Sequence, residues 1–152
     1  MSATVQLGAC QSAVYRAEAE ALSGTGRRWR RIEEVRRYVD ALVRADWFAE
    51  RWPDLLDVGV ERRGAGARWS LAVAEATGYP GGPCTEGRIL VAGPLSQLVV
   101  LHELAHLLAH PDDTHGPVFA RIHLELVRQE MGFAAFTDYR DALRRVPALT
   151  GV

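Results

Sequence analysis

The chain has 152 residues, enough for one domain and too few for two ordinary ones, so we expect a single domain spanning residues 1–152. Its composition, 48% hydrophobic and 24% charged, excludes a disordered chain. Because the formal net charge is −1 and all 18 basic side chains are Arg, we expect neither a general attraction to nucleic acid or anionic membranes nor catalysis by Lys.

The N-terminal part of the chain is predicted to form two helices. Ser12 can cap a helix over residues 13–22, and Gly24 ends it. Apolar residues at helical spacing predict a second helix over residues 32–45. An aromatic group follows, which we expect to close one end of the core: Trp47, Phe48 and Trp52.

The middle of the chain is predicted to form three strands. Apolar and polar residues alternate around residues 56–60 and again around 69–73, which predicts a β-hairpin with its turn at residues 63–67. After a loop rich in Gly and Pro, a short apolar strand is expected over residues 88–92.

The C-terminal part is predicted to form three helices. Pro94 opens the first, over residues 95–109, and Pro111 ends it because a residue before Pro disfavours the helical conformation. The second runs from Pro117 to about Met131 and is ended by Gly132, and the last covers residues 136–146. Two helices, three strands and three helices in this order predict an α+β fold.

All five His of the chain lie between residues 102 and 123, and two of them form the motif His102-Glu103-Leu104-Ala105-His106. His residues at i and i+4 share one face of a helix and can bind one ion. A zinc ion lowers the pKa of a bound water to about 7, and Glu103 can take the proton from that water. The motif therefore predicts a zinc site with Glu103 as the catalytic base.

A catalytic zinc ion normally takes three protein ligands and leaves one position open. We expect His115 to be the third ligand, because residues 111–114 can turn the chain back toward His102 and His106. The carboxylates that remain as alternatives are Glu125, Asp112 and Asp113.

The two other His residues have less direct roles in this prediction. His110 lies about 12 Å along the helix axis from His102, so both rings cannot meet one ion tetrahedrally, and we expect His110 to be a helix-end neighbour. His123 is expected to be a packed helix residue. Tyr79 and Tyr139 are possible donors to an oxyanion, but nothing in the sequence places either near the ion.

The segments VVLHELAHLL (residues 99–108) and DDTHGPVFARIHLELV (residues 112–127) resemble a family of small actinobacterial metallohydrolases named for their HExxH motif. More distantly, the His-Gly-Pro-x-Phe pattern starting at His115 is similar to SprT-like and related minimal zincins, in which this His is the third zinc ligand. The resemblance implies a zincin-like fold, with a small sheet packed on the metal-binding helix, and it supports His115.

The sequence departs in two places from the motifs of known zincin families. The spacing from HExxH to His115 is shorter than in typical SprT-like proteins, and Ala109 and Asp112 stand where the metzincin motif has its Gly and its third His. In zincins the strand before the active helix often pairs with an extended peptide. Residues 88–92 would be that strand, or an ordinary strand of the sheet.

These observations predict a cytoplasmic zinc metallohydrolase, foremost a metallopeptidase acting on a peptide or protein. Alternatives are a small-molecule metallohydrolase, a non-catalytic zinc-binding domain, and a SprT-like DNA-associated protease. The last is suggested by the Arg-rich stretch around Trp29, which is also typical of a solvated surface, so a nucleic-acid partner is not favoured. We expect no contact with membranes, because no apolar run approaches the length of about 20 residues that a spanning helix needs.

Overall fold

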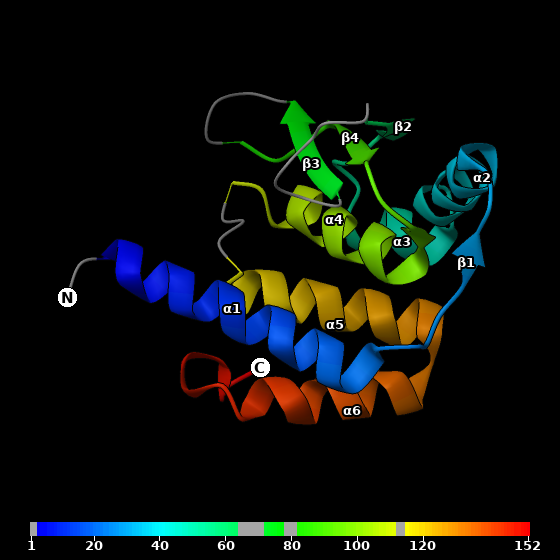
Figure 1. Cartoon of the computed structure of the whole chain (residues 1–152). Coiled ribbons are helices and arrows are strands. Elements are labelled where there is room, and N and C mark those ends of the chain that lie inside the picture. The colour runs from blue at the N-terminus through cyan, green and yellow to red at the C-terminus, as the bar shows by residue number, and fades with distance from the viewer. Residues whose placement is uncertain (1–2, 64–71, 78–81, 112–114) are drawn as a thin grey trace. The chain divides into compact units, whose positions relative to one another are not determined.

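The computed structural model of the protein describes residues 3–63, 72–77, 82–111 and 115–152. The chain forms two compact units: a helical unit made of Met1–Gly26 and Asp112–Val152, and a mixed unit made of Arg27–Pro111. Helices and strands both occur (Figure 1), which confirms the α+β prediction. No helix in the described ranges is both long and apolar enough to cross a membrane.

The mixed unit contains a three-stranded sheet in the order β2-β4-β3. β4 (Glu86–Val91) lies in the centre, parallel to β2 (Asp57–Arg62) and antiparallel to β3 (Ala72–Thr77). The predicted hairpin is therefore wrong, because β4 separates its two strands. Of its predicted turn, residues 64–67 lie outside the described residues. Alternation indicates which face of a strand is buried but not which strand lies beside it.

The central position of β4 also excludes one predicted binding mode. Both edges of β4 are hydrogen-bonded, one to β2 and the other to β3. A peptide can add to a sheet only at an edge with unpaired backbone groups. The strand predicted over residues 88–92 is thus an ordinary sheet strand and offers no edge to an extended substrate.

Helix α4 (Gln97–Ala109) packs against β3 and β4. It begins later than predicted, because Leu95–Ser96 form a short strand, β5, that pairs with β1 (Arg28–Trp29). The Ser96 hydroxyl then accepts a hydrogen bond from the backbone N–H of Val99 at 3.2 Å and caps the helix. The end of α4 at Ala109 confirms the boundary predicted from Pro111.

A glycine allows α4 to approach the sheet closely. A Cβ atom added at Gly87, on β4, would lie 2.6 Å from Cδ1 of Leu107, which is buried. Gly87→Ala is expected to lower the free energy of unfolding by about 1–3 kcal/mol, because Leu107 must leave its packed position. Urea unfolding followed by circular dichroism measures this loss.

Gly59→Ala is the matched control for this prediction. Gly59 lies on β2, and a Cβ atom there would meet Cγ of Arg88 at 3.7 Å and the backbone oxygen of Gly87 at 4.0 Å, both ordinary contact distances. We expect little change in the free energy of unfolding. Equal losses in both variants would show that the cost does not come from contact with Leu107.

Two further helices complete the mixed unit, α2 (Ile32–Val43) and α3 (Asp46–Arg51). α2 packs against β2 through an apolar face that contains Val35 and Val39. On α3, the buried ring of Phe48 contacts two half-buried Trp rings, as expected for the aromatic group.

The helical unit consists of α1 (Ala3–Leu22), α5 (Pro117–Met131), α6 (Phe133–Arg144) and a 3-10 turn, η1 (Pro147–Leu149). α6 packs against both α1 and α5. The predicted cap at Ser12 is wrong, because α1 begins at Ala3 and Ser12 lies inside it; residues such as Ala, Gln and Leu before Ser12 favour helix. Gly24, with a φ of 77°, follows the helix end as predicted.

Candidate metal centre

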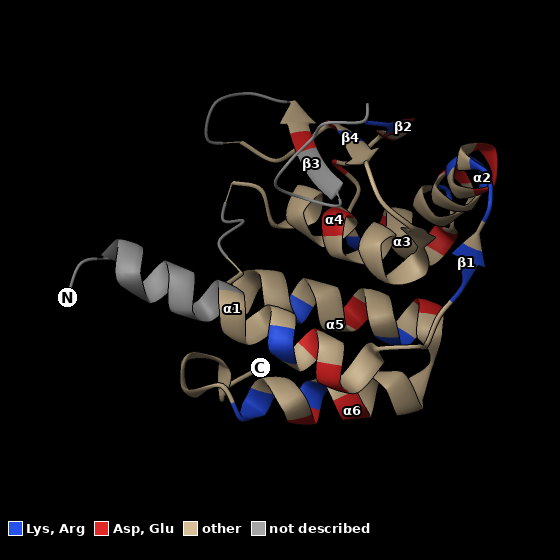
Figure 2. Ribbon diagram, in the orientation of Figure 1, with Lys and Arg blue, Asp and Glu red and all other residues tan. Residues whose placement is uncertain are grey.

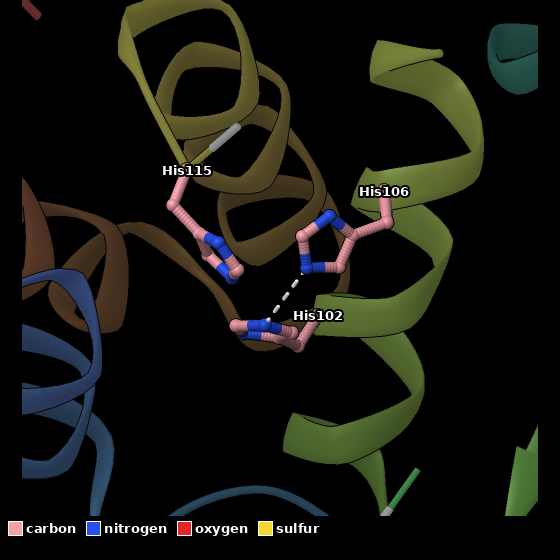
Figure 3. A group of neighbouring side chains, drawn as sticks. All are labelled: His102, His106 and His115. Atoms are coloured by element: carbon pink, nitrogen blue, oxygen red, sulfur yellow. Dashed lines mark hydrogen bonds between the residues drawn. The ribbon is translucent and has the colours of Figure 1, made fainter. Parts of the chain in front are cut away.

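The two His residues of the HExxH motif lie one helical turn apart on α4. Their Nε2 atoms are 3.3 Å apart and their ring centroids 5.0 Å apart, with the rings nearly perpendicular (Figure 3). His102 is buried and His106 is half-buried. The structure thus brings together, within one unit, the pair of nitrogen atoms that the i, i+4 spacing predicts.

The separation of these nitrogens fits a zinc ion. Tetrahedral zinc binds His nitrogens at about 2.0–2.1 Å, which puts two such ligands about 3.3–3.4 Å apart. The observed 3.3 Å between Nε2 of His102 and Nε2 of His106 agrees with this value. The imidazole pair therefore has both the chemistry and the spacing to hold a metal ion.

Glu103 follows His102 directly on α4, about 100° further around the helix. Its side chain is only 8% exposed, and its helical neighbours Val100, Leu101, Leu104 and Leu107 are apolar and buried. A carboxylate in such a place costs free energy unless a cation or hydrogen-bond donors compensate its charge. Glu103 thus lies next to His102 in sequence, on the same buried helix.

His115, the third side chain labelled in Figure 3, belongs to the helical unit and lies two residues before α5. It is buried, and its φ of 53° places it in the left-handed region. Residues other than Gly rarely adopt this conformation, and such residues cluster at functional sites. Of the carboxylates predicted as alternative third ligands, Glu125 is half-buried on α5. Asp112 and Asp113 lie outside the described residues.

The two remaining His residues occupy the places expected of them. His110 is half-buried and follows directly after α4, as its C-cap residue. His123 is fully buried on α5, and its Nδ1 lies 2.9 Å from the hydroxyl oxygen of Tyr139 on α6. Tyr139 is therefore engaged in the core of the helical unit, and the other candidate oxyanion donor, Tyr79, lies outside the described residues.

Burial, and after it the negative charge of Glu18, raises the pKa of Tyr139 well above its usual value. A raised pKa in the folded protein means that Tyr139 contributes stability below the pKa of the unfolded chain, about 10, and loses it as the pH rises further. The chain has no Lys, so no Lys titration overlaps that of Tyr139. Folding stability is expected to fall steeply above pH 10.

Tyr139→Phe is expected to flatten this dependence. At pH 7 the variant loses about 1–3 kcal/mol of stability, because the hydrogen bond to His123 is gone. Between pH 10 and 11 the free energy of unfolding should fall less steeply than in the wild type. Urea unfolding across pH 7–11 measures both effects, and an unchanged slope would contradict the assignment to Tyr139.

The Arg-rich stretch does not form a uniformly basic surface. Both signs of charge lie on α2, beside the basic strand β1 (Figure 2). The ring of Trp29 is half-buried and packs on Tyr38, with ring centroids 4.9 Å apart. The guanidinium of Arg36 donates to the backbone oxygen of Val60 at 2.8 Å. Part of this segment thus contributes to the fold itself.

Comparison with known proteins finds no relative. The chain matches no protein-family model, no curated protein and no solved structure.

Sequence reasoning missed one part of the candidate site. The ring of His115 lies beside the rings of Tyr15 and Phe119, at centroid distances of 5.3 and 4.7 Å. Phe119 lies four residues after His115, a helical spacing that could have drawn attention to it. Nothing in the local sequence connects His115 with Tyr15, a hundred residues earlier.

Proposed function

We propose that this protein is a zinc-dependent metallohydrolase of zincin-like fold, and specifically a metallopeptidase. The observation that carries the proposal is the 3.3 Å separation between Nε2 of His102 and Nε2 of His106, with Glu103 adjacent on the same helix. Packing of α4 on β3 and β4 supports the zincin-like assignment, since a sheet then backs the metal-binding helix.

His102, His106 and His115 would hold the ion. Zinc, when bound, would lower the pKa of a coordinated water to about 7, so that a hydroxide nucleophile would be available near neutral pH.

Glu103 would act as the general base. Its carboxylate takes a proton as the water attacks the peptide carbonyl, and then delivers a proton to the departing amine.

The chain connection supports His115 as the third ligand. From the end of α4 at Ala109 to His115 the backbone spans at most about 20 Å, a length that would allow His115 to reach an ion held by His102 and His106. The left-handed backbone of His115 turns the chain sharply just before α5. Glu125, Asp112 and Asp113 are the ligands to test against it.

Metal analysis tests the proposal directly. Protein dialysed against zinc and then against buffer is expected to retain about one zinc ion per chain, and His106→Ala is expected to retain none. His110→Ala is the matched control, because it removes a half-buried His from the end of the same helix and should leave the zinc bound. Wild-type protein without stoichiometric zinc would refute the proposed function.

A further inference from the structure

The imidazole of His115 lies near two aromatic rings of the helical unit. Tyr15, on α1, has its ring centroid 5.3 Å away with a tilt of 46°. Phe119, on α5, has its ring centroid 4.7 Å away with a tilt of 55°. Aromatic pairs at these distances and angles attract one another beyond the effect of burial alone. We refer to Tyr15 and Phe119 together as the aromatic clamp.

The inner ring of the clamp is fixed by the core of the helical unit. Phe119 is fully buried, and its ring lies 5.3 Å from that of His123. His123 is in turn hydrogen-bonded to Tyr139 on α6, which is also fully buried. Phe119 therefore presents a rigid surface to one face of His115.

The outer ring is different, because Tyr15 is 48% exposed. Its side chain can be replaced without opening a cavity in the core. Tyr15 thus offers a way to loosen His115 while the rest of the unit stays packed.

From this arrangement we infer that the aromatic clamp positions the His115 ring for metal binding before the ion arrives. The inference rests on the proposed function, in which His115 is a zinc ligand. A ligand already held in one rotamer loses less conformational entropy on binding, so the affinity for the ion is higher. Tyr15 and Phe119 are positioning residues, since they act on the ion only through His115.

Tyr15→Leu tests the inference. Removal of the outer ring is expected to raise the zinc dissociation constant about tenfold, the lower end of the cost of removing a group that orients a metal ligand. Tyr15→Phe keeps the ring and is expected to restore the wild-type dissociation constant. Competition with a chromophoric chelator measures all three values, and Ser12→Ala, an exposed position one turn earlier on α1, should leave the constant unchanged.

A second measurement separates positioning from a loss of folding. In the metal-free wild type, the NMR couplings of the His115 side chain should report one χ1 rotamer, and in Tyr15→Leu they should report averaging, while the thermal midpoint changes little. A dissociation constant of Tyr15→Leu within twofold of the wild type would overturn the inference, as would a single rotamer in both proteins. If the wild type binds no zinc, the proposed function fails. The rotamer measurement on metal-free protein would still test whether the aromatic clamp holds the His115 ring in one rotamer.

Discussion

Replacement of Glu103 by Gln is expected to lower kcat/KM for peptide hydrolysis by about 10²–10⁴-fold, the usual contribution of a positioned general base. Gln keeps the size and shape of the side chain but cannot accept the proton of the attacking water. Zinc should remain bound in the variant, because the proposed ligands are His102, His106 and His115 and not Glu103. The expected result is thus a variant that binds zinc as the wild type does but has almost no peptidase activity.

The experiment uses zinc-loaded protein and a mixture of internally quenched fluorogenic peptides, with the metal content measured on the same samples. Glu33→Gln, an exposed carboxylate on α2, is the matched control and should keep wild-type activity. Hydrolysis by Glu103→Gln at the wild-type rate would refute the assignment of the base. Loss of zinc from this variant would instead assign Glu103 to the ligand set.

Replacement of His115 by Ala is expected to weaken zinc binding by about 10²–10⁴-fold. The binding free energy of zinc to small protein sites, about 10–16 kcal/mol, is shared among the three proposed ligands, so one ligand contributes about 3–5 kcal/mol. His102 and His106 remain on α4 in this variant and should still bind zinc, though weakly. Chelator competition measures the change in the dissociation constant.

Glu125→Gln is the comparison that distinguishes the possible ligand sets. Glu125 is half-buried on α5, ten residues after His115, and is the alternative ligand on the described part of the chain. If His115 is the ligand, Glu125→Gln should bind zinc as the wild type does. Tight binding by His115→Ala together with weak binding by Glu125→Gln would transfer the assignment to Glu125.

The parts of the structure that depend on local geometry could be predicted from the sequence. The i, i+4 spacing of His102 and His106 fixes their relation on any helix, so their proximity followed once residues around them were recognised as helical. The boundaries of α5 at Pro117 and Met131 agree with the prediction, because Pro at a helix start and Gly after its end act locally.

The parts that depend on pairing between distant segments could not be predicted in the same way. β2 pairs with β4 and not with β3, although β3 comes first along the chain. Apolar alternation is equally strong in either arrangement, so the sequence does not distinguish them. The contact of Tyr15 with His115 also joins distant segments, because Tyr15 lies on α1 and His115 lies two residues before α5.

The helical unit is assembled from segments on both sides of the mixed unit, and this arrangement constrains the order of folding on the ribosome. α1 is synthesised before the mixed unit, yet it packs against α6, which is synthesised after it. The mixed unit is continuous in sequence, so its sheet and α4 can form before α6 is available to α1. Residues 102 and 106 therefore belong to a segment that can fold early, whereas the surroundings of His115 are completed only after α6 has been synthesised.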